Sequence, residues 1–397
     1  MQFDRVDSLN GNSLQAYPLS RYAAKYWIFH ARSGDINSTP DLQKLATHLL
    51  LHQHVRASWN RIWDIDWPLQ GVDRTRAPAS PLYYASMACL EVVVKMFVKS
   101  GADVNAQGGL LGNPLQAASI QGSEAIVEML IESGVDVNAQ AGFSGNALQA
   151  ASYEGSEAIV KMLIKSGARV NAQGGFLGNA LQAASFRGSE TIVKILIESG
   201  ADVHAQGGRY GNALQAASSQ PCEAVVKMLI ESGADVHAQG GFYGCALHAA
   251  SYQGSESIVK ILIENGADVN AQGGRFGNAL QAASFRGSEA VVKMLIESGA
   301  DVHAQGGRYG NALQAASSQG SGAIVKMLIE SGADVNVHGG PYGAALQAAL
   351  CHGHLGIAQL LLHNGAETVA PLVTAIPSAN WSVQTSRSIS STGESSE

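Results

Sequence analysis

The chain has 397 residues, and its 25 Lys and Arg residues against 32 Asp and Glu residues leave a formal net charge of −7. This balance, without any run of lysine or arginine, excludes duplex nucleic acid and anionic membrane surfaces as main partners. No segment approaches the roughly 18 uninterrupted apolar residues of a membrane span, and the polar N-terminus lacks the apolar core of a signal peptide. The four cysteines share no spacing typical of a zinc site or a disulfide framework. We therefore expect a cytoplasmic protein with free thiols.

Residues 1–79 differ in composition from the rest of the chain, because they hold four of the five tryptophans. Trp59, Trp63 and Trp67 are spaced four apart and would share one face of a helix that stops before Pro68. Since the terminal unit of a stacked array has to be covered, we expect this region to be a helical linker that caps the first unit. The alternative, that the three rings anchor a partner, stays open.

From residue 80 to residue 366 the chain repeats itself every 33 residues. The phrase GADVNAQGG at 101–109 returns, with a decayed last copy, in segments that begin at Gly134, Gly167, Gly200, Gly233, Gly266, Gly299, Gly332 and Gly365. Such a period, with two short helical patterns in each unit, is typical of a stacked solenoid and not of a globular enzyme. We predict an all-α solenoid of nine units whose function lies on its surface.

A unit from the middle of the array illustrates how the pattern predicts structure. Asn146 is placed to cap a short inner helix over 147–153. Ser156 is placed to cap a longer outer helix over 157–165, and Gly167 is placed for the left-handed residue that follows this helix. The outer helix has an apolar face formed by Ile159, Val160, Leu163 and Ile164. An extended segment and a Gly-Gly turn, together called the finger below, lead to the next unit.

Residues 367–397 are rich in Ser and Thr and poor in apolar side chains. A segment of this composition cannot bury enough apolar surface to offset the entropy lost on ordering. We therefore expect a disordered tail.

Histidines recur at one position of the repeat, as His204, His237 and His303, and could suggest a ladder of metal ions. Successive units are expected about 8 to 10 Å apart, whereas a zinc–nitrogen bond is about 2 Å, so neighbouring copies cannot share one ion. Asn occupies the same position in other units, which indicates a hydrogen-bonding role. A second group is interpreted as structural too, and consists of Cys351, His352, His354 and His363. With both histidine groups interpreted as structural, we expect no metal and no cofactor. Candidate nucleophiles such as Ser152 recur in most units, which a catalytic residue has no reason to do, so we expect no enzymatic activity.

Comparison of the aligned units shows where the chain has varied. Core positions hardly change, whereas variation concentrates at the two residues after each Gly-Gly turn, the finger tip, and at the end of each inner helix. The tip pairs are Leu110-Leu111, Phe143-Ser144, Phe176-Leu177, Arg209-Tyr210, Phe242-Tyr243, Arg275-Phe276, Arg308-Tyr309 and Pro341-Tyr342. The inner-helix ends carry Ile120, Tyr153, Phe186, Ser219, Tyr252, Phe285, Ser318 and Cys351.

Exposed Tyr, Phe and Arg side chains carry much of the energy of protein interfaces, and here we expect them about every 10 Å along one groove. The sequence therefore predicts a protein-binding surface formed by Arg209, Tyr210, Tyr243, Arg275, Phe276, Arg308 and Tyr309. The alternative is that tip residues vary because nothing restrains them, with the aromatic rings packed finger on finger.

The array resembles the ankyrin repeat family, whose 33-residue units consist of helix, turn, helix and a hairpin finger carrying GADVN. The resemblance covers the nine units and implies an ankyrin solenoid that binds another protein on its concave face. Two features depart from the family pattern: TPLH at the start of the inner helix is replaced by NPLQ at 113–116 and mostly NALQ afterwards, and the Asp-Gly finger has become Gly-Gly. Asn and Gln are expected to supply the hydrogen bonds of the family's Thr and His.

The recurring pattern QGGxxGNALQAAS is similar to arrays at the C-terminal end of fungal NACHT-type NTPases, the STAND class that includes vegetative-incompatibility proteins. Residues 17–32 resemble the helical part that joins such an NTPase to its array. The chain has no G-x-x-x-x-G-K-[ST] motif, so the phosphate-binding loop of an NTPase is not within it. The resemblance implies the recognition part of a STAND-type receptor, expected as a monomer. The alternatives are a general intracellular scaffold or adaptor and, disfavoured by the lack of a catalytic motif, an enzyme within residues 1–79.

Overall fold

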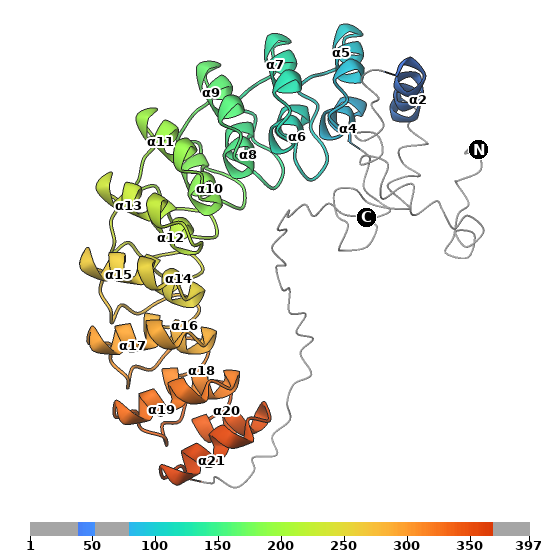
Figure 1. Ribbon diagram of the computed structural model, residues 1–397. Coiled ribbons are helices and arrows are strands. Elements are labelled where there is room, and N and C mark those ends of the chain that lie inside the picture. Colours follow the sequence, from blue (N-terminus) through green and yellow to red (C-terminus); the bar gives the residue numbers. More distant parts are fainter. Residues whose placement is uncertain (1–38, 52–78, 368–397) are drawn as a thin grey trace, which may run out of the picture. The chain divides into compact units, whose positions relative to one another are not determined.

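The computed structural model of the protein describes residues 39–51 and 79–367. The predictions about residues 17–32, about Trp59, Trp63 and Trp67, and about the tail from residue 368 onward lie outside these described residues. The described part consists of α2 (Pro40–Leu51) and a regular array of paired short helices (Figure 1).

The described residues contain nine helix pairs, which confirms the predicted all-α solenoid. The inner helices are α4 (Pro81–Met87), α6 (Pro114–Ile120), α8 (Ala147–Glu154), α10 (Ala180–Arg187), α12 (Ala213–Ser218), α14 (Ala246–Gln253), α16 (Ala279–Arg286), α18 (Ala312–Gln319) and α20 (Ala345–Cys351). The outer helices are α5 (Glu91–Lys99), α7 (Glu124–Glu132), α9 (Glu157–Lys165), α11 (Glu190–Glu198), α13 (Glu223–Glu231), α15 (Glu256–Glu264), α17 (Glu289–Glu297), α19 (Gly322–Glu330) and α21 (Leu355–His363).

Most inner helices begin at an asparagine cap. At the start of α8, Asn146 Oδ1 accepts a hydrogen bond from the Gln149 backbone N–H at 2.9 Å, and the Asn146 N–H donates to Gln149 Oε1 at 3.0 Å. These bonds satisfy two backbone donors that a helix start otherwise leaves unpaired. The predicted cap is therefore confirmed, and the helix ends one residue later than expected. The capping oxygen recurs in Asn113, Asn179, Asn212, Asn278 and Asn311.

The outer helices bury the apolar face that their spacing predicts. In α9 the side chains of Ile159, Val160 and Leu163 are fully buried, and the helix has the predicted bounds. Gly167 follows it with a φ of 88°, as expected. The predicted capping role of Ser156 is wrong, because its side chain makes no capping hydrogen bond. Its hydroxyl instead lies next to Gly122, in the helix–helix turn of the preceding unit.

The inner helices form one row and the outer helices a second row (Figure 1). In the inner row the buried side chains are mostly small, as in α12, where Ala216 and Ala217 are fully buried beside Leu214. Small side chains allow neighbouring inner helices to approach each other more closely than neighbouring outer helices do. Taken by itself, the array therefore curves toward its inner row (Figure 1).

Helix α2 lies against the first helix pair. Its Ala46 and Leu50 side chains are buried in the same apolar core as Leu82 of α4 and Val93 of α5. This contact covers apolar surface that the first unit of a solenoid would otherwise expose. None of the helices in the described parts of the chain has the length and apolar character needed to cross a bilayer.

Candidate functional site

Each finger joins an outer helix to the next inner helix and is closed by a backbone hydrogen bond between its two legs. In the fourth finger the Gly207 N–H donates to the Gly211 carbonyl oxygen at 2.8 Å. The equivalent bond occurs in every described finger, beginning with Gly108 N–H to Gly112 oxygen in the first and ending with Gly339 N–H to Gly343 oxygen in the last. The tip residues between the two legs are therefore held in the same position in each unit.

The fingers are also hydrogen-bonded to one another. The N–H of Phe143 donates to the Leu110 carbonyl oxygen at 2.8 Å, and the equivalent bond joins each following tip to the one before it. The last of these bonds runs from the Arg308 N–H to the Arg275 carbonyl oxygen at 3.0 Å. We call these six bonds the tip ladder. Pro341 holds the donor position in the last finger, and the ladder ends there because proline has no N–H.

The tip ladder accounts for the second glycine of each Gly-Gly turn. Gly241 has a φ of 63°, and a Cβ on it would lie closer than 3.0 Å to the backbone carbonyl of Tyr210 in the preceding tip. The same overlap with the preceding tip would occur at Gly142, Gly175, Gly208, Gly274, Gly307 and Gly340. Direct contact between consecutive fingers thus explains why the second residue of this turn is glycine.

Glutamine side chains join most inner helices to the finger that follows them. Gln149 Nε2 donates to the carbonyl oxygens of Ala172 at 3.0 Å and Gly178 at 2.8 Å. In α14 a histidine replaces this glutamine, and His248 Nε2 lies 3.0 Å from the carbonyl oxygen of Ala271, the equivalent of Ala172. The expectation that Asn and Gln supply the hydrogen bonds of the usual Thr and His is therefore confirmed.

The first residue of each tip belongs to what we call the tip column. The rings of Phe143 and Phe176 stack with centroids 4.8 Å apart. The Arg209 guanidinium carbon lies 5.2 Å from the Phe176 ring and 4.9 Å from the Phe242 ring, so this side chain is held between two aromatic faces. The Arg275 guanidinium carbon lies 5.2 Å from the centroid of the same Phe242 ring. Phe143, Phe176, Arg209 and Arg275 are exposed.

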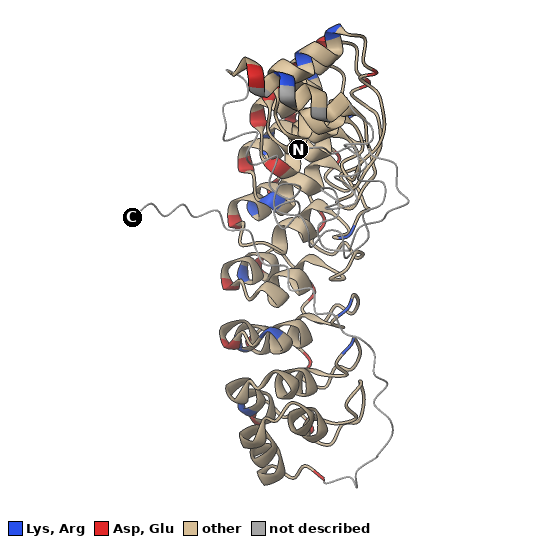
Figure 2. Cartoon of the chain, turned by 90° about the vertical axis from the view of Figure 1, so that its right-hand side faces the viewer, with Lys and Arg blue, Asp and Glu red and all other residues tan. Residues whose placement is uncertain are grey.

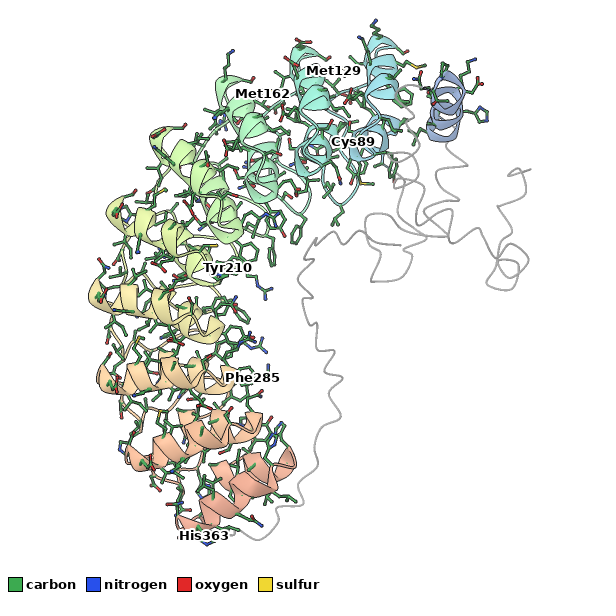
Figure 3. All side chains as sticks on the ribbon, viewed as in Figure 1. Cys89, Met129, Met162, Tyr210, Phe285 and His363 are labelled. Carbon is green, nitrogen blue, oxygen red and sulfur yellow. The ribbon has the colours of Figure 1, made fainter. Side chains whose placement is uncertain are left out.

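The second residue of each tip packs against the ends of the inner helices. Phe186 stacks on Tyr210 at 4.7 Å, and Phe285 stacks on Tyr309 at 4.4 Å. Rings also stack between units, with Tyr210 and Tyr243 at 6.3 Å. The resulting aromatic cluster, with Tyr210 and Phe285 labelled in Figure 3, consists of Tyr153, Phe186, Tyr210, Tyr243, Tyr252, Phe276, Phe285 and Tyr309.

The structure brings the seven predicted contact residues onto one side of the array but does not expose all of them. Tyr210 and Tyr309 are 8% exposed and Phe276 is 3% exposed, and Tyr243 is half-buried. The expectation that these rings are exposed is wrong for the first three, because rings from neighbouring units are close enough to stack. Arg209 and Arg275 are exposed and Arg308 is half-buried. Binding by the seven residues stays a prediction.

The expected spacing of about 10 Å along this surface is wrong at the tips. Equivalent rings of neighbouring units have centroids 4.8 Å apart in the tip column, between Phe143 and Phe176. In the aromatic cluster the corresponding separation is 6.4 Å, between Phe276 and Tyr309. The value of 10 Å applies to packed helices, whereas the tips lie on the concave side and are joined directly by backbone hydrogen bonds.

Two further arginines belong to this surface and were not among the predicted contact residues. Arg187 ends α10 and Arg286 ends α16, and both are exposed. The signal was present in the sequence, because each follows the variable aromatic residue at an inner-helix end, Phe186 or Phe285.

The histidines make local contacts. The described residues contain no group of three or more His, Cys, Asp or Glu side chains arranged to hold a metal ion. Asn171, at the repeat position of His204, donates from Nδ2 to the Gly200 carbonyl oxygen at 2.9 Å in the next unit. In the last pair, His354 Nε2 lies 3.3 Å from the Ser318 carbonyl oxygen of the preceding unit. The Ser152 side chain, one of the repeated hydroxyls, is fully buried.

Burial changes the acidity of the tyrosines in the aromatic cluster. Burial, aided by the nearby Tyr252, raises the pKa of Tyr243 to about 12. Burial also raises the pKa of Tyr210 and of Tyr309, while Arg209 and Arg308 respectively act in the opposite direction. These hydroxyls therefore stay protonated in the folded array at pH values where a tyrosine in water ionises.

Stability is expected to fall at alkaline pH for this reason. The tyrosines of the unfolded chain release their protons near pH 10, whereas the pKa of Tyr243 in the folded array is about 12. The stabilisation that comes from the protonated tyrosines is therefore complete below about pH 10 and is lost as the pH rises toward about 12. The urea midpoint, measured at about pH 9 and about pH 11, should fall further for the natural chain than for a Tyr210→Phe, Tyr243→Phe, Tyr309→Phe variant. Equal falls would contradict the role of the cluster, because lysine ionisation is common to both proteins.

Comparison with protein families identifies the repeat. The family model described as ankyrin repeats, in three copies, matches the chain in overlapping windows: 82–174, 117–207, 148–240, 181–273, 214–306 and 280–371. Together these windows cover most of the chain, including all nine helix pairs.

Two individual proteins are similar to parts of the chain. The azaphilone pigments biosynthesis cluster protein L of Monascus ruber is 38% identical over 118 residues, which cover 25% of this chain and 24% of that protein. The chain thus matches about a quarter of the length of this curated relative. The crystal structure of the human ASB11 ankyrin repeat domain is 26% identical, covers 56% of this chain and 99% of its own, and superposes with a TM-score of 0.48.

Proposed function

Because the chain belongs to the ankyrin repeat family, we propose that it is a non-enzymatic module that binds another protein across its finger tips and inner-helix ends. One observation carries the proposal. The backbone of every finger is held by the same hydrogen bonds, while the tip side chains change from unit to unit, from Phe143 and Phe176 to Arg209 and Arg275. A fixed support with exposed, varied aromatic and arginine side chains is suited to protein recognition.

The finer form of the proposal is the recognition part of a fungal STAND-type receptor, acting in the cytoplasm as a monomer. It is supported by the QGGxxGNALQAAS pattern and by the similarity of residues 17–32 to the joining segment of such proteins. In this role the array would work with an NTPase domain. A general scaffold or adaptor would use the same surface and is the alternative.

Affinity capture from extract of the source cells, with chemical cross-linking, tests the proposal. The first variant replaces Phe143, Phe176, Arg209 and Arg275, all exposed in the tip column, by Ala. We expect this variant to lose the proteins that the natural chain captures, because it removes side chains without touching the buried ring contacts. The matched control replaces four exposed lysines of the outer helices by Ala, and these are Lys194, Lys260, Lys293 and Lys326.

The control should capture the same proteins as the natural chain. Identical sets from all three proteins would overturn the proposed surface. A captured NTPase with a G-x-x-x-x-G-K-[ST] motif would favour the receptor, and captured proteins without one would favour the scaffold.

A further inference from the structure

The positive charges of the array are divided between two surfaces according to residue type. In residues 79–367 all nine lysines lie in outer helices. Five of the six arginines lie instead at finger tips or inner-helix ends, and they are Arg187, Arg209, Arg275, Arg286 and Arg308. Figure 2 shows Asp and Glu gathered over the helices and basic residues on some of the finger loops. We call the side with the five arginines the arginine face.

Six of these nine lysines are paired with acidic residues of their own helices. Lys161 lies 3.8 Å from Glu157, and Lys326 lies 3.7 Å from Glu330. The same type of pair occurs in α11, α13, α15 and α17. By contrast, no ion pair within residues 39–51 and 79–367 involves the exposed arginines, which are Arg187, Arg209, Arg275 and Arg286. Their charge is therefore not balanced within the described chain.

Acidic side chains are nearly absent from the arginine face. Among the tips and inner-helix ends, the one acidic residue is Glu154, at the end of α8. The aspartates of the finger legs keep their charge and accept local backbone hydrogen bonds, as in Asp202, whose Oδ1 accepts from the His204 N–H at 2.9 Å. The tips and inner-helix ends therefore carry a local excess of positive charge on a chain with a net charge of −7.

Aromatic rings restrain two of the arginines while leaving them exposed. The Arg209 guanidinium carbon lies over the Phe176 and Phe242 rings, and the Arg275 guanidinium carbon lies over the Phe242 ring. Contact with a ring does not use the five N–H donors of a guanidinium. A guanidinium held in this way loses little freedom when it forms two parallel hydrogen bonds to a carboxylate.

We propose that the arginine face binds an extended, acidic segment of a partner protein, whose Asp and Glu carboxylates pair with these guanidinium groups. This inference rests on the proposed protein-binding function and adds the chemical class of the partner. Nucleic acid is disfavoured because the ring faces that would stack on bases are occupied by one another, as in Phe143 with Phe176. The face also lacks the lysines that follow a phosphate backbone, and the net charge of the chain repels one.

The spacing of the arginines predicts the spacing of the acidic residues. Arg209 and Arg275 are two steps apart on the tip ladder, and hydrogen-bonded strands lie about 4.8 Å apart, so the two side chains start about 10 Å from each other. An extended segment advances about 3.3 Å per residue, so it covers this distance in about three residues. We therefore expect acidic residues about three positions apart in the segment.

Selection from random peptides on the purified full chain tests the inference. Displayed peptides of about 16 residues should be enriched for Asp and Glu at this spacing, and their binding should weaken as salt increases. Selected peptides without an acidic excess would overturn the inference and leave the proposed protein binding intact. If neither peptide selection nor extract capture yields a binder, the proposed function fails as well.

Variants then locate the site with a synthetic copy of the strongest selected peptide. Arg187→Gln, Arg209→Gln, Arg275→Gln and Arg286→Gln together should raise its Kd by at least about tenfold. Lys194→Gln, Lys260→Gln, Lys293→Gln and Lys326→Gln remove the same charge from the outer helices and should change the Kd by less than about twofold. Equal weakening in both variants, or tighter binding of a single-stranded oligonucleotide than of the peptide, would overturn the assignment. Thermal melts of both variants confirm that each is folded.

Discussion

Replacing Gly241 by Ala should destabilise the array by about 3 to 5 kcal/mol. Part of this loss is the strain of a residue with a Cβ at positive φ, about 1 to 2 kcal/mol. The rest arises because the new methyl group overlaps the Tyr210 carbonyl, so the fingers have to separate and the Phe242 N–H to Arg209 bond is lost. Urea unfolding followed by circular dichroism measures the loss.

Gly233→Ala is the matched control for this prediction. Gly233 also has a positive φ, 90°, but no atom lies within 4 Å of the position of its Cβ. This variant should therefore lose only the strain, about 1 to 2 kcal/mol. If both variants lose the same amount, the fingers have room for a Cβ and the tip ladder does not require glycine.

Replacing Leu214 by Ala should cost about 2 to 5 kcal/mol, the range for removing a leucine side chain from a packed core. Leu214 is 1% exposed in α12, where it lies in the core that runs through the array. Because each unit of a solenoid packs only on its neighbours, the loss should be concentrated near this helix. Hydrogen exchange should accelerate most in α12 and in the pairs α10–α11 and α14–α15.

Leu355→Ala supplies the comparison, because it makes the same chemical change at a side chain that is 66% exposed. It should change the free energy of unfolding by less than about 1 kcal/mol. A loss as large as that of Leu214→Ala would mean that burial does not determine the effect.

The helices could be predicted from the sequence because their causes are local. The Asn146 cap depends on a residue three positions away, and the apolar face of α9 depends on spacing within nine residues. The same reasoning was wrong for Ser156, whose side chain makes no capping hydrogen bond and lies next to Gly122 of the preceding unit. The pattern within one unit does not show what its neighbour places beside a side chain.

The candidate site was less predictable because it depends on the distance between units. Variation at Tyr210, Phe276 and Tyr309 placed these residues together on one side of the array but did not reveal that their rings are buried. That fact follows from a tip separation of about 5 Å, which the helix spacing of about 10 Å did not suggest. Arg187 and Arg286 were not predicted because their repeat position carries Gln, Glu or His in most other units, so arginine did not stand out there.

The tip ladder also aligns peptide dipoles along the array. Every one of its bonds has the donor in the later unit and the acceptor in the earlier one, so the peptide dipoles of the tips point the same way, as they do in an α-helix. The negative end of this aligned row lies at Arg308, whose carbonyl oxygen faces Pro341 and receives no ladder bond from it. A partial negative charge favours a cationic side chain nearby, and the residue at this end of the row is an arginine.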